Sequence, residues 1–164
     1  QVRKLAFKIV NSSTILLPAW YDLCRQLNMA EKLIPRDVPT RWNSTYDMAV
    51  ATVEYEAVYK RITADKELGL RGYELTRREW IILRQLRDIL KDATLFFSRG
   101  SPTIASVIPA MDLIDTKLGD AARETDDTVL DPAIRTAAGI AKRTINRYYK
   151  ISDMSSTYRI AMGE

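Results

Sequence analysis

The chain has 164 residues, of which 46% are hydrophobic and 28% are charged, and its net charge is +4. This composition is ordinary for a globular protein with a core, and it argues against a disordered chain. No apolar run approaches the ~20 residues that a membrane span needs. Histidine is absent and Cys24 is the only cysteine, which excludes histidine-dependent catalysis, an internal disulfide and a Cys/His zinc site.

Apolar residues at helical spacing predict helices through most of the first 63 residues. A first helix begins at Val2 and ends before residues 11–13, and a second begins near Pro18. Their core-facing residues are expected to be Val2, Leu5, Ala6, Ile9, Val10, Trp20, Leu23, Cys24 and Leu27. The prolines at 35 and 39 disfavour a helix between them. One long helix is then expected from about Thr40 to about Thr63.

Three local signals predict where later helices begin. Thr76 and Glu79 form a capping box in which two unpaired backbone donors are satisfied reciprocally. Ser101–Pro102 and Asp131–Pro132 each place a capping side chain before a proline at the first helical position. Gly100 should end the helix that the capping box opens, and Pro109 should bend the next one. The last helix should bury Ile134, Ala137, Ala138, Ala141, Ile145 and Tyr148.

No segment alternates with period 2 for long enough to predict a strand, so the expected fold is all-α. Two helices of ~24 residues would each span ~36 Å, which favours an elongated antiparallel helical bundle. We treat residues 1–164 as a single helical domain or fragment. Residues 1–36 form lead-in helices, 37–100 hold the long helices, and 101–164 hold the capped helices and a closing segment.

Few side chains offer enzyme chemistry. Asp112 and Asp115 lie three residues apart, and Asp126–Asp127 lie in an acidic loop. Carboxylates so placed could hold Mg²⁺, although a solvated helix face and a solvated loop explain them as well. The 6 glycines are scattered and never form a phosphate-binding loop. We therefore expect no resident metal and no cofactor, and Cys24 is expected to be a small buried residue.

The string Asp37–Val38–Pro39–Thr40–Arg41–Trp42–Asn43 places an acid, an arginine and a tryptophan at the mouth of a long helix. Backbone N–H groups there favour anions. A guanidinium can bind a phosphate with two hydrogen bonds, and an indole can stack on an unpaired base. The alternative is that Trp42 is a core residue and that Thr40 or Asp37 only caps the helix. Residue chemistry alone leaves both interpretations open.

The stretch DVPTRWNSTYDM resembles the D-V-x-T-R-W-N-S-T-Y-x-M-L block of hAT-family DNA transposases, although Ala49 replaces the leucine that follows Met48. Segments on both sides resemble the family in the same order, so the resemblance covers nearly the whole chain. These segments are Val2–Leu5 to Leu23–Cys24, Glu79–Trp80 to Ser98, Pro102–Thr103–Ile104 to Pro109, Tyr148–Lys150 and Tyr158–Met162.

The resemblance implies a helical insertion in an RNase H-like transposase whose acidic D-D-E triad uses Mg²⁺ or Mn²⁺. Neither the aspartate pair nor the glutamate of that triad has a counterpart here, so the chain is expected to be a fragment that is not catalytic alone. Trp42 would stack on a flipped base beside a DNA hairpin, and Arg41 would contact a nearby phosphate. Thr40 and Asn43 complete the expected DNA-binding set.

The expected partner is therefore transposon-end DNA, bound as part of a larger enzyme in the nucleus. A homo-oligomer is a further expectation, whereas a membrane and a small-molecule cofactor are not expected. Residues 1–42 carry 7 Lys/Arg against 3 Asp/Glu, which permits a polyanionic partner. The alternative is a domesticated transposon remnant that binds a protein. A small helical enzyme is the remaining class, and the absence of histidine argues against it.

Overall fold

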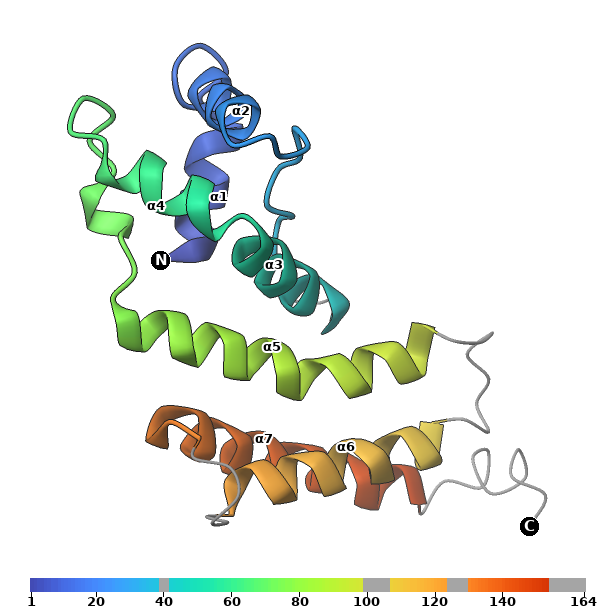
Figure 1. Ribbon diagram of the computed structural model, residues 1–164. Coiled ribbons are helices and arrows are strands. Elements are labelled where there is room, and N and C mark those ends of the chain that lie inside the picture. Colours follow the sequence, from blue (N-terminus) through green and yellow to red (C-terminus); the bar gives the residue numbers. More distant parts are fainter. Residues whose placement is uncertain (39–41, 99–106, 124–129, 154–164) are drawn as a thin grey trace. The chain divides into compact units, whose positions relative to one another are not determined.

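The computed structural model describes residues 1–38, 42–98, 107–123 and 130–153 (Figure 1). Within these ranges the chain forms seven α-helices and one short 3-10 helix and no strand, so the all-α prediction is confirmed there. The helices are α1 (Val2–Val10), α2 (Leu16–Gln26), α3 (Trp42–Glu54), α4 (Glu56–Ala64), η1 (Arg71–Tyr73), α5 (Arg77–Ser98), α6 (Val107–Ala122) and α7 (Pro132–Asp153). None of these described helices combines the length and apolar character needed to cross a membrane.

The chain divides into two compact units, residues Gln1–Arg84 and Gln85–Glu164. The first unit holds α1 to α4, η1 and the start of α5, and the second holds the rest of α5 with α6 and α7. The division falls inside α5, and therefore inside the expected segment 37–100. We describe each unit separately.

The core of the first unit is built around Trp20 of α2. Its indole is fully buried, stacks on Tyr55 with ring centroids 6.1 Å apart, and donates from Nε1 to the Lys32 carbonyl at 2.9 Å. Cys24, one turn along α2, is also fully buried, and burial raises the pKa of its thiol. This confirms the expectation that Cys24 is a small core residue. Val10, expected in the core, is 37% exposed at the end of α1.

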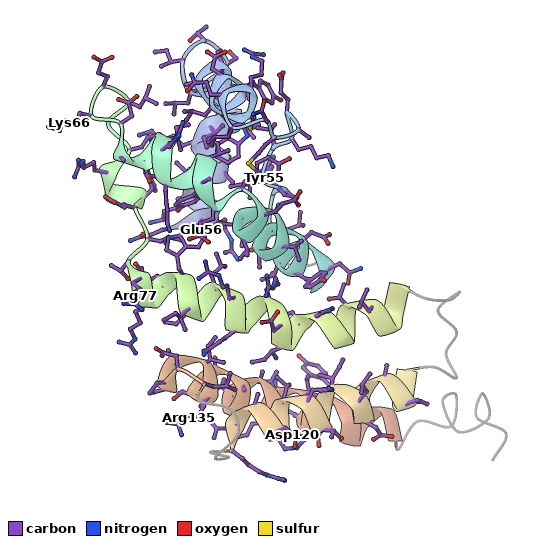
Figure 2. All side chains as sticks on the ribbon, viewed as in Figure 1. Tyr55, Glu56, Lys66, Arg77, Asp120 and Arg135 are labelled. Carbon is purple, nitrogen blue, oxygen red and sulfur yellow. The ribbon has the colours of Figure 1, made fainter. Side chains whose placement is uncertain are left out.

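The prediction of one long helix from Thr40 to Thr63 is wrong, because the helix is interrupted at Tyr55. The backbone there has φ −93° and ψ 24°, and α4 begins at the next residue, Glu56 (Figure 2). Tyr55 is 2% exposed and its hydroxyl donates to the Ala30 carbonyl at 2.9 Å. The bend is thus associated with a buried ring and a hydrogen bond to a residue far away in the sequence.

The second unit contains an antiparallel pair of helices, α6 and α7, that lie side by side (Figure 1). Ile114 and Leu118 of α6 pack with Ala138 of α7, and Ile89 of α5 contacts the same cluster. The Lys142 side chain lies close to Gly119, and its ammonium forms an ion pair with the Asp115 carboxylate at 2.6 Å. A Cβ at Gly119 would lie 3.2 Å from the Lys142 ammonium, so a side chain there would crowd that pair.

Two of the three predicted caps are confirmed. The Thr76 N–H donates to Glu79 Oε2 at 2.8 Å, and the Glu79 N–H donates to Thr76 Oγ1 at 3.3 Å. Asp131 Oδ1 accepts from the Ala133 N–H at 2.9 Å, and α7 begins at Pro132. Ser101–Pro102 and the terminator Gly100 lie outside the described residues.

The bend expected at Pro109 stays a prediction, because the residues just before Val107 lie outside the described ranges. The last helix differs from prediction in its buried face. Tyr148, expected in the core, is 55% exposed, and Ala137 is also exposed. The buried residues of α7 are Ile134 and Ala138, and Ala141 and Ile145 are partly buried against the same cluster. Fewer residues of α7 are therefore buried than periodicity suggested.

Candidate nucleic-acid interface

Residues 29–38, which follow α2 and precede α3, form an irregular segment without helix or strand. Two core side chains hold this segment through its carbonyl groups. Tyr55 donates to Ala30 and Trp20 donates to Lys32, each at 2.9 Å. Ile34 is 3% exposed and belongs to the same core. The segment is thus fixed before it reaches Asp37, the first residue of the candidate DNA-binding block.

The Asp37 side chain is fully buried and is surrounded by donors. Its Oδ1 accepts hydrogen bonds from the Thr45 hydroxyl at 2.8 Å and from the Ser44 hydroxyl at 3.0 Å. Its Oδ2 accepts from the guanidinium of Arg3, an ion pair that joins α1 to the block. We call Arg3, Asp37, Ser44 and Thr45 the Asp37 cluster. It connects two segments that are 34 residues apart in the sequence.

Burial alone would raise the pKa of Asp37, because a carboxylate loses solvation away from water. The hydrogen bonds from Thr45, Ser44 and Arg3, together with the Arg3 charge, outweigh burial and hold the pKa below its usual value. Asp37 is therefore an ionised structural anchor at neutral pH. Hydrogen bonds to a charged acceptor are stronger than those between neutral groups, which suits a cluster that fixes the chain.

Ser44 also binds the backbone on the other side of the block. The Val38 N–H donates to Ser44 Oγ at 2.8 Å, and the Ser44 hydroxyl lies 2.9 Å from the Val38 carbonyl oxygen. Since a hydroxyl has one proton, it can donate to Asp37 or to Val38 at any moment. Both ends of residues 39–41 are thereby tied together: Asp37 and Val38 before them, and the first turns of α3 after them.

The predicted site residues are placed only in part. Thr40 and Arg41 lie outside the described residues, and so does the side chain of Trp42, the first residue of α3. Asn43 follows in the first turn and is exposed. The structure therefore does not test the four-residue site, which stays a prediction.

The Asp37 cluster was not predicted from the sequence. Asp37 was expected at most as a helix cap, and no role was expected for Arg3, Ser44 or Thr45. A signal was present, because a carboxylate and two hydroxyls lie within nine residues of one another in a single block. Arg3 could not have been found this way, since only the fold brings it to Asp37.

The carboxylates considered for Mg²⁺ form no metal site within the described residues. Asp112 is exposed on α6, and Asp115 is paired with Lys142. Asp126–Asp127 lie outside the described residues. Within the part of the chain that the structure describes, no group of three or more Asp, Glu, Cys or His residues could hold a metal ion.

Comparison with known protein families identifies the chain. The sequence model of the ZBED1 RNase-like helical domain matches residues 1–89, more than half of the chain. The chain belongs to this family. Its helical domain is therefore hAT-related and transposase-derived, in agreement with the resemblance of the Asp37–Met48 block. Searches of curated proteins and of solved structures found no match.

The matched range includes all of the first compact unit and the first part of α5. It contains the whole Asp37 cluster and the Arg41–Trp42 pair. The resemblance that we noted for residues 102–162 lies outside the match and stays a prediction.

Proposed function

We propose that this transposase-derived domain helps to bind transposon-end DNA at an unpaired nucleotide and acts as a scaffold for the catalytic core of its parent enzyme. The observation that carries the proposal is the Asp37 cluster. A buried, ionised carboxylate with three side-chain donors fixes the chain on both sides of residues 39–41. Restraining a binding segment before it meets DNA reduces the entropy lost on binding.

The start of α3 suits an anionic ligand. The first backbone N–H groups of a helix lack partners within the helix, and the helix dipole favours negative charge there. α3 has no acidic residue in its first turn, so nothing in that turn opposes a phosphate. In the proposal Arg41 binds a phosphate, Trp42 stacks on the unpaired base, and Thr40 and Asn43 donate hydrogen bonds nearby.

The proposed role of the chain is binding and scaffolding. Metal-dependent strand transfer is assigned to the parent enzyme, which would use Mg²⁺ or Mn²⁺ and work in the nucleus. A homo-oligomer of the parent belongs to the same proposal. These assignments rest on the resemblance of the Asp37–Met48 block to hAT transposases.

Replacing Trp42 with alanine is expected to weaken binding of a DNA hairpin with unpaired end nucleotides by about 1–3 kcal/mol, because one base loses its stacking partner. Replacing Arg41 with alanine should weaken hairpin binding and should also lower the slope of log affinity against log salt concentration by about one. Fluorescence anisotropy with labelled hairpin and blunt duplex DNA over a salt series measures both quantities.

The matched control is Gln26→Ala, which changes an exposed residue of α2 outside the predicted DNA-binding set and removes neither a ring nor a charge. Thermal melting of every variant separates binding from folding, because a core tryptophan truncated to alanine would cost about 3–5 kcal/mol of stability. A Trp42→Ala chain that loses stability, beside a wild type with no preference for the hairpin, would contradict DNA binding. A scaffold or protein-binding role would then remain.

A further inference from the structure

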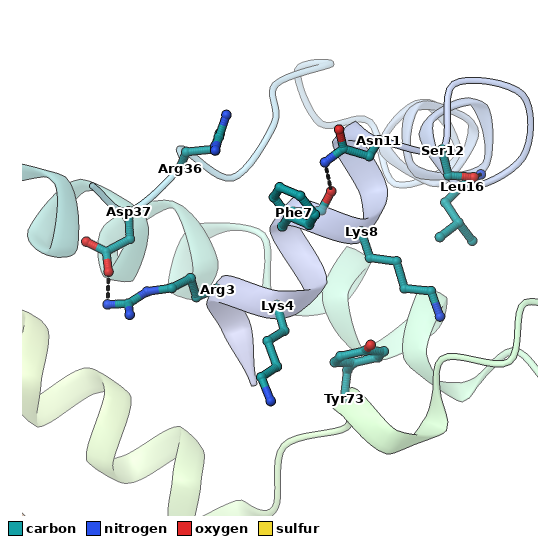
Figure 3. Close-up of a pocket in the computed structure, with 10 residues that line it drawn as sticks. All are labelled: Arg3, Lys4, Phe7, Lys8, Asn11, Ser12, Leu16, Arg36, Asp37 and Tyr73. Atoms are coloured by element: carbon teal, nitrogen blue, oxygen red, sulfur yellow. Dashed lines mark hydrogen bonds and ion pairs between the residues drawn. The ribbon is translucent and has the colours of Figure 1, made fainter. Parts of the chain in front are cut away.

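One face of α1 lines an open groove, which shares Arg3 and Asp37 with the Asp37 cluster (Figure 3). The groove has a volume of about 690 Å³ and lies wholly within the first compact unit. Its floor and walls include the rings of Phe7 and Tyr73 and the side chain of Leu16. Its charged residues are Arg3, Lys4, Lys8, Arg36 and Asp37.

The accessible charge of the groove has a single sign. Lys4, Lys8 and Arg36 are exposed, and the Arg3 side chain is 62% exposed. Asp37 is the one acid among the described lining residues, and its carboxylate is fully buried against Arg3. A ligand in the groove would therefore meet cations and no accessible carboxylate, which favours an anionic partner.

The aromatic rings lie beside these cations. The Arg36 guanidinium is positioned over the Phe7 ring, 5.6 Å from its centroid, and the Lys8 ammonium over the Tyr73 ring at 5.4 Å. Phe7 is nevertheless 53% exposed. The opposite face of α1 packs in the core. Because about half of the Phe7 side chain is exposed, the ring contributes less to packing than a buried ring of its size would.

The arrangement follows from the helical repeat of α1. Val2, Leu5, Ala6 and Ile9 are buried on one face. The opposite face of α1 carries Arg3, Lys4, Phe7 and Lys8, at spacings of one and four residues. Three cations and a ring therefore share one surface. Alternating cations and exposed rings are the features with which proteins bind unpaired nucleic acid strands.

We propose that this groove binds an unpaired DNA strand, with a base stacked on Phe7 and the flanking phosphates bound by Lys4 and Arg36. The inference extends the proposed function to a second surface, and it rests on that function only in taking DNA as the partner. Phosphates supply the negative charge that the groove lacks, and bases supply flat apolar surface for Phe7. An acidic peptide would satisfy the cations but would leave the exposed ring without a stacking partner.

The test uses the 164-residue chain and a labelled oligothymidylate, with affinity measured by anisotropy over a salt series. The double substitution Lys4→Ala/Arg36→Ala should reduce the salt slope by about 1.4, since each single-strand phosphate contact contributes about 0.7. The control is Arg61→Ala/Lys66→Ala, which removes two exposed cations of the same unit that do not line the groove. The control should change the slope little.

Phe7 tests stacking separately from charge. Phe7→Ala should weaken oligothymidylate binding roughly 5- to 160-fold at constant salt slope. Phe7→Trp should keep the wild-type affinity for oligothymidylate. An abasic strand of equal length should bind the wild type and Phe7→Ala with the same affinity. Because Phe7 is exposed, thermal melting of these variants should match the wild type.

The inference is overturned if the groove and control double variants lose the same slope, or if an oligoglutamate of equal charge binds as tightly as the DNA strand. Trp42→Ala should leave the oligothymidylate salt slope unchanged. If the wild type shows no preference for the hairpin but the groove double variant still has a lower salt slope, the proposed function is contradicted and the groove is supported. If the wild type prefers the hairpin and the groove double variant keeps the wild-type salt slope, the groove is contradicted and the proposed function is supported.

Discussion

Replacing Trp20 with alanine is expected to lower the free energy of unfolding by about 3–5 kcal/mol. The indole is fully buried, and its removal leaves a cavity against Tyr55. It also leaves the Lys32 carbonyl without its 2.9 Å hydrogen bond. Since Lys32 belongs to the segment that leads to Asp37, the loss should reach the candidate interface as well as the core. Urea unfolding followed by circular dichroism measures the effect.

Two variants control this experiment. Phe7→Ala also truncates an aromatic ring in the first unit, but the ring is 53% exposed, so its cost should stay below about 1 kcal/mol. Trp20→Phe removes the indole donor and only part of the apolar volume, so its stability should fall between those of the other two. A Trp20→Ala protein as stable as Phe7→Ala would show that α2 is not the centre of the core.

Replacing Asp37 with alanine is expected to cost about 2–3 kcal/mol of stability, because it leaves the Ser44 and Thr45 hydroxyls without their charged acceptor. The Arg3 guanidinium contributes less to this cost, since 62% of its side chain is exposed and water can solvate it. Hairpin affinity should fall with stability, because residues 39–41 lose their anchor. Urea unfolding and anisotropy on the same protein test both expectations.

The stability contributed by Asp37 should depend on pH. Its pKa is lowered in the folded chain, so the contribution is present above the ordinary aspartate pKa of about 4 and is lost as pH falls through the folded value. The stability difference between wild type and Asp37→Asn should therefore shrink below about pH 4. Asp47→Asn, the same change at an exposed position of α3, is the control. A pH-independent difference would contradict an ionised anchor.

Features set by neighbouring residues were predictable from the sequence. The capping box of Thr76 and Glu79 and the Asp131–Pro132 start depend on contacts within three residues, and both are found as expected. The buried faces of α1 and α2 follow from helical periodicity. The all-α fold follows from the same local pattern.

Features set by distant residues were not predictable. The bend at Tyr55 accompanies a hydrogen bond to Ala30, 25 residues earlier, and periodicity carries no information on such a partner. The Arg3–Asp37 pair spans 34 residues, so neither residue indicated an ion pair or a groove beside it. The block Asp37–Met48 indicated Arg41 and Trp42 as site residues, whereas the structure describes the residues on either side of 39–41.

The central claim, that Trp42 stacks on an unpaired base, is tested most directly by placing the fluorescent base 2-aminopurine at the unpaired position of a DNA hairpin. Stacking on an indole quenches this base, so the wild-type chain should shorten its fluorescence lifetime at saturating protein. Trp42→Ala should leave the lifetime near that of free DNA, and Trp42→Phe should give a partial effect. An equal shortening with wild type and Trp42→Ala, or none with the bound wild type, would contradict the account.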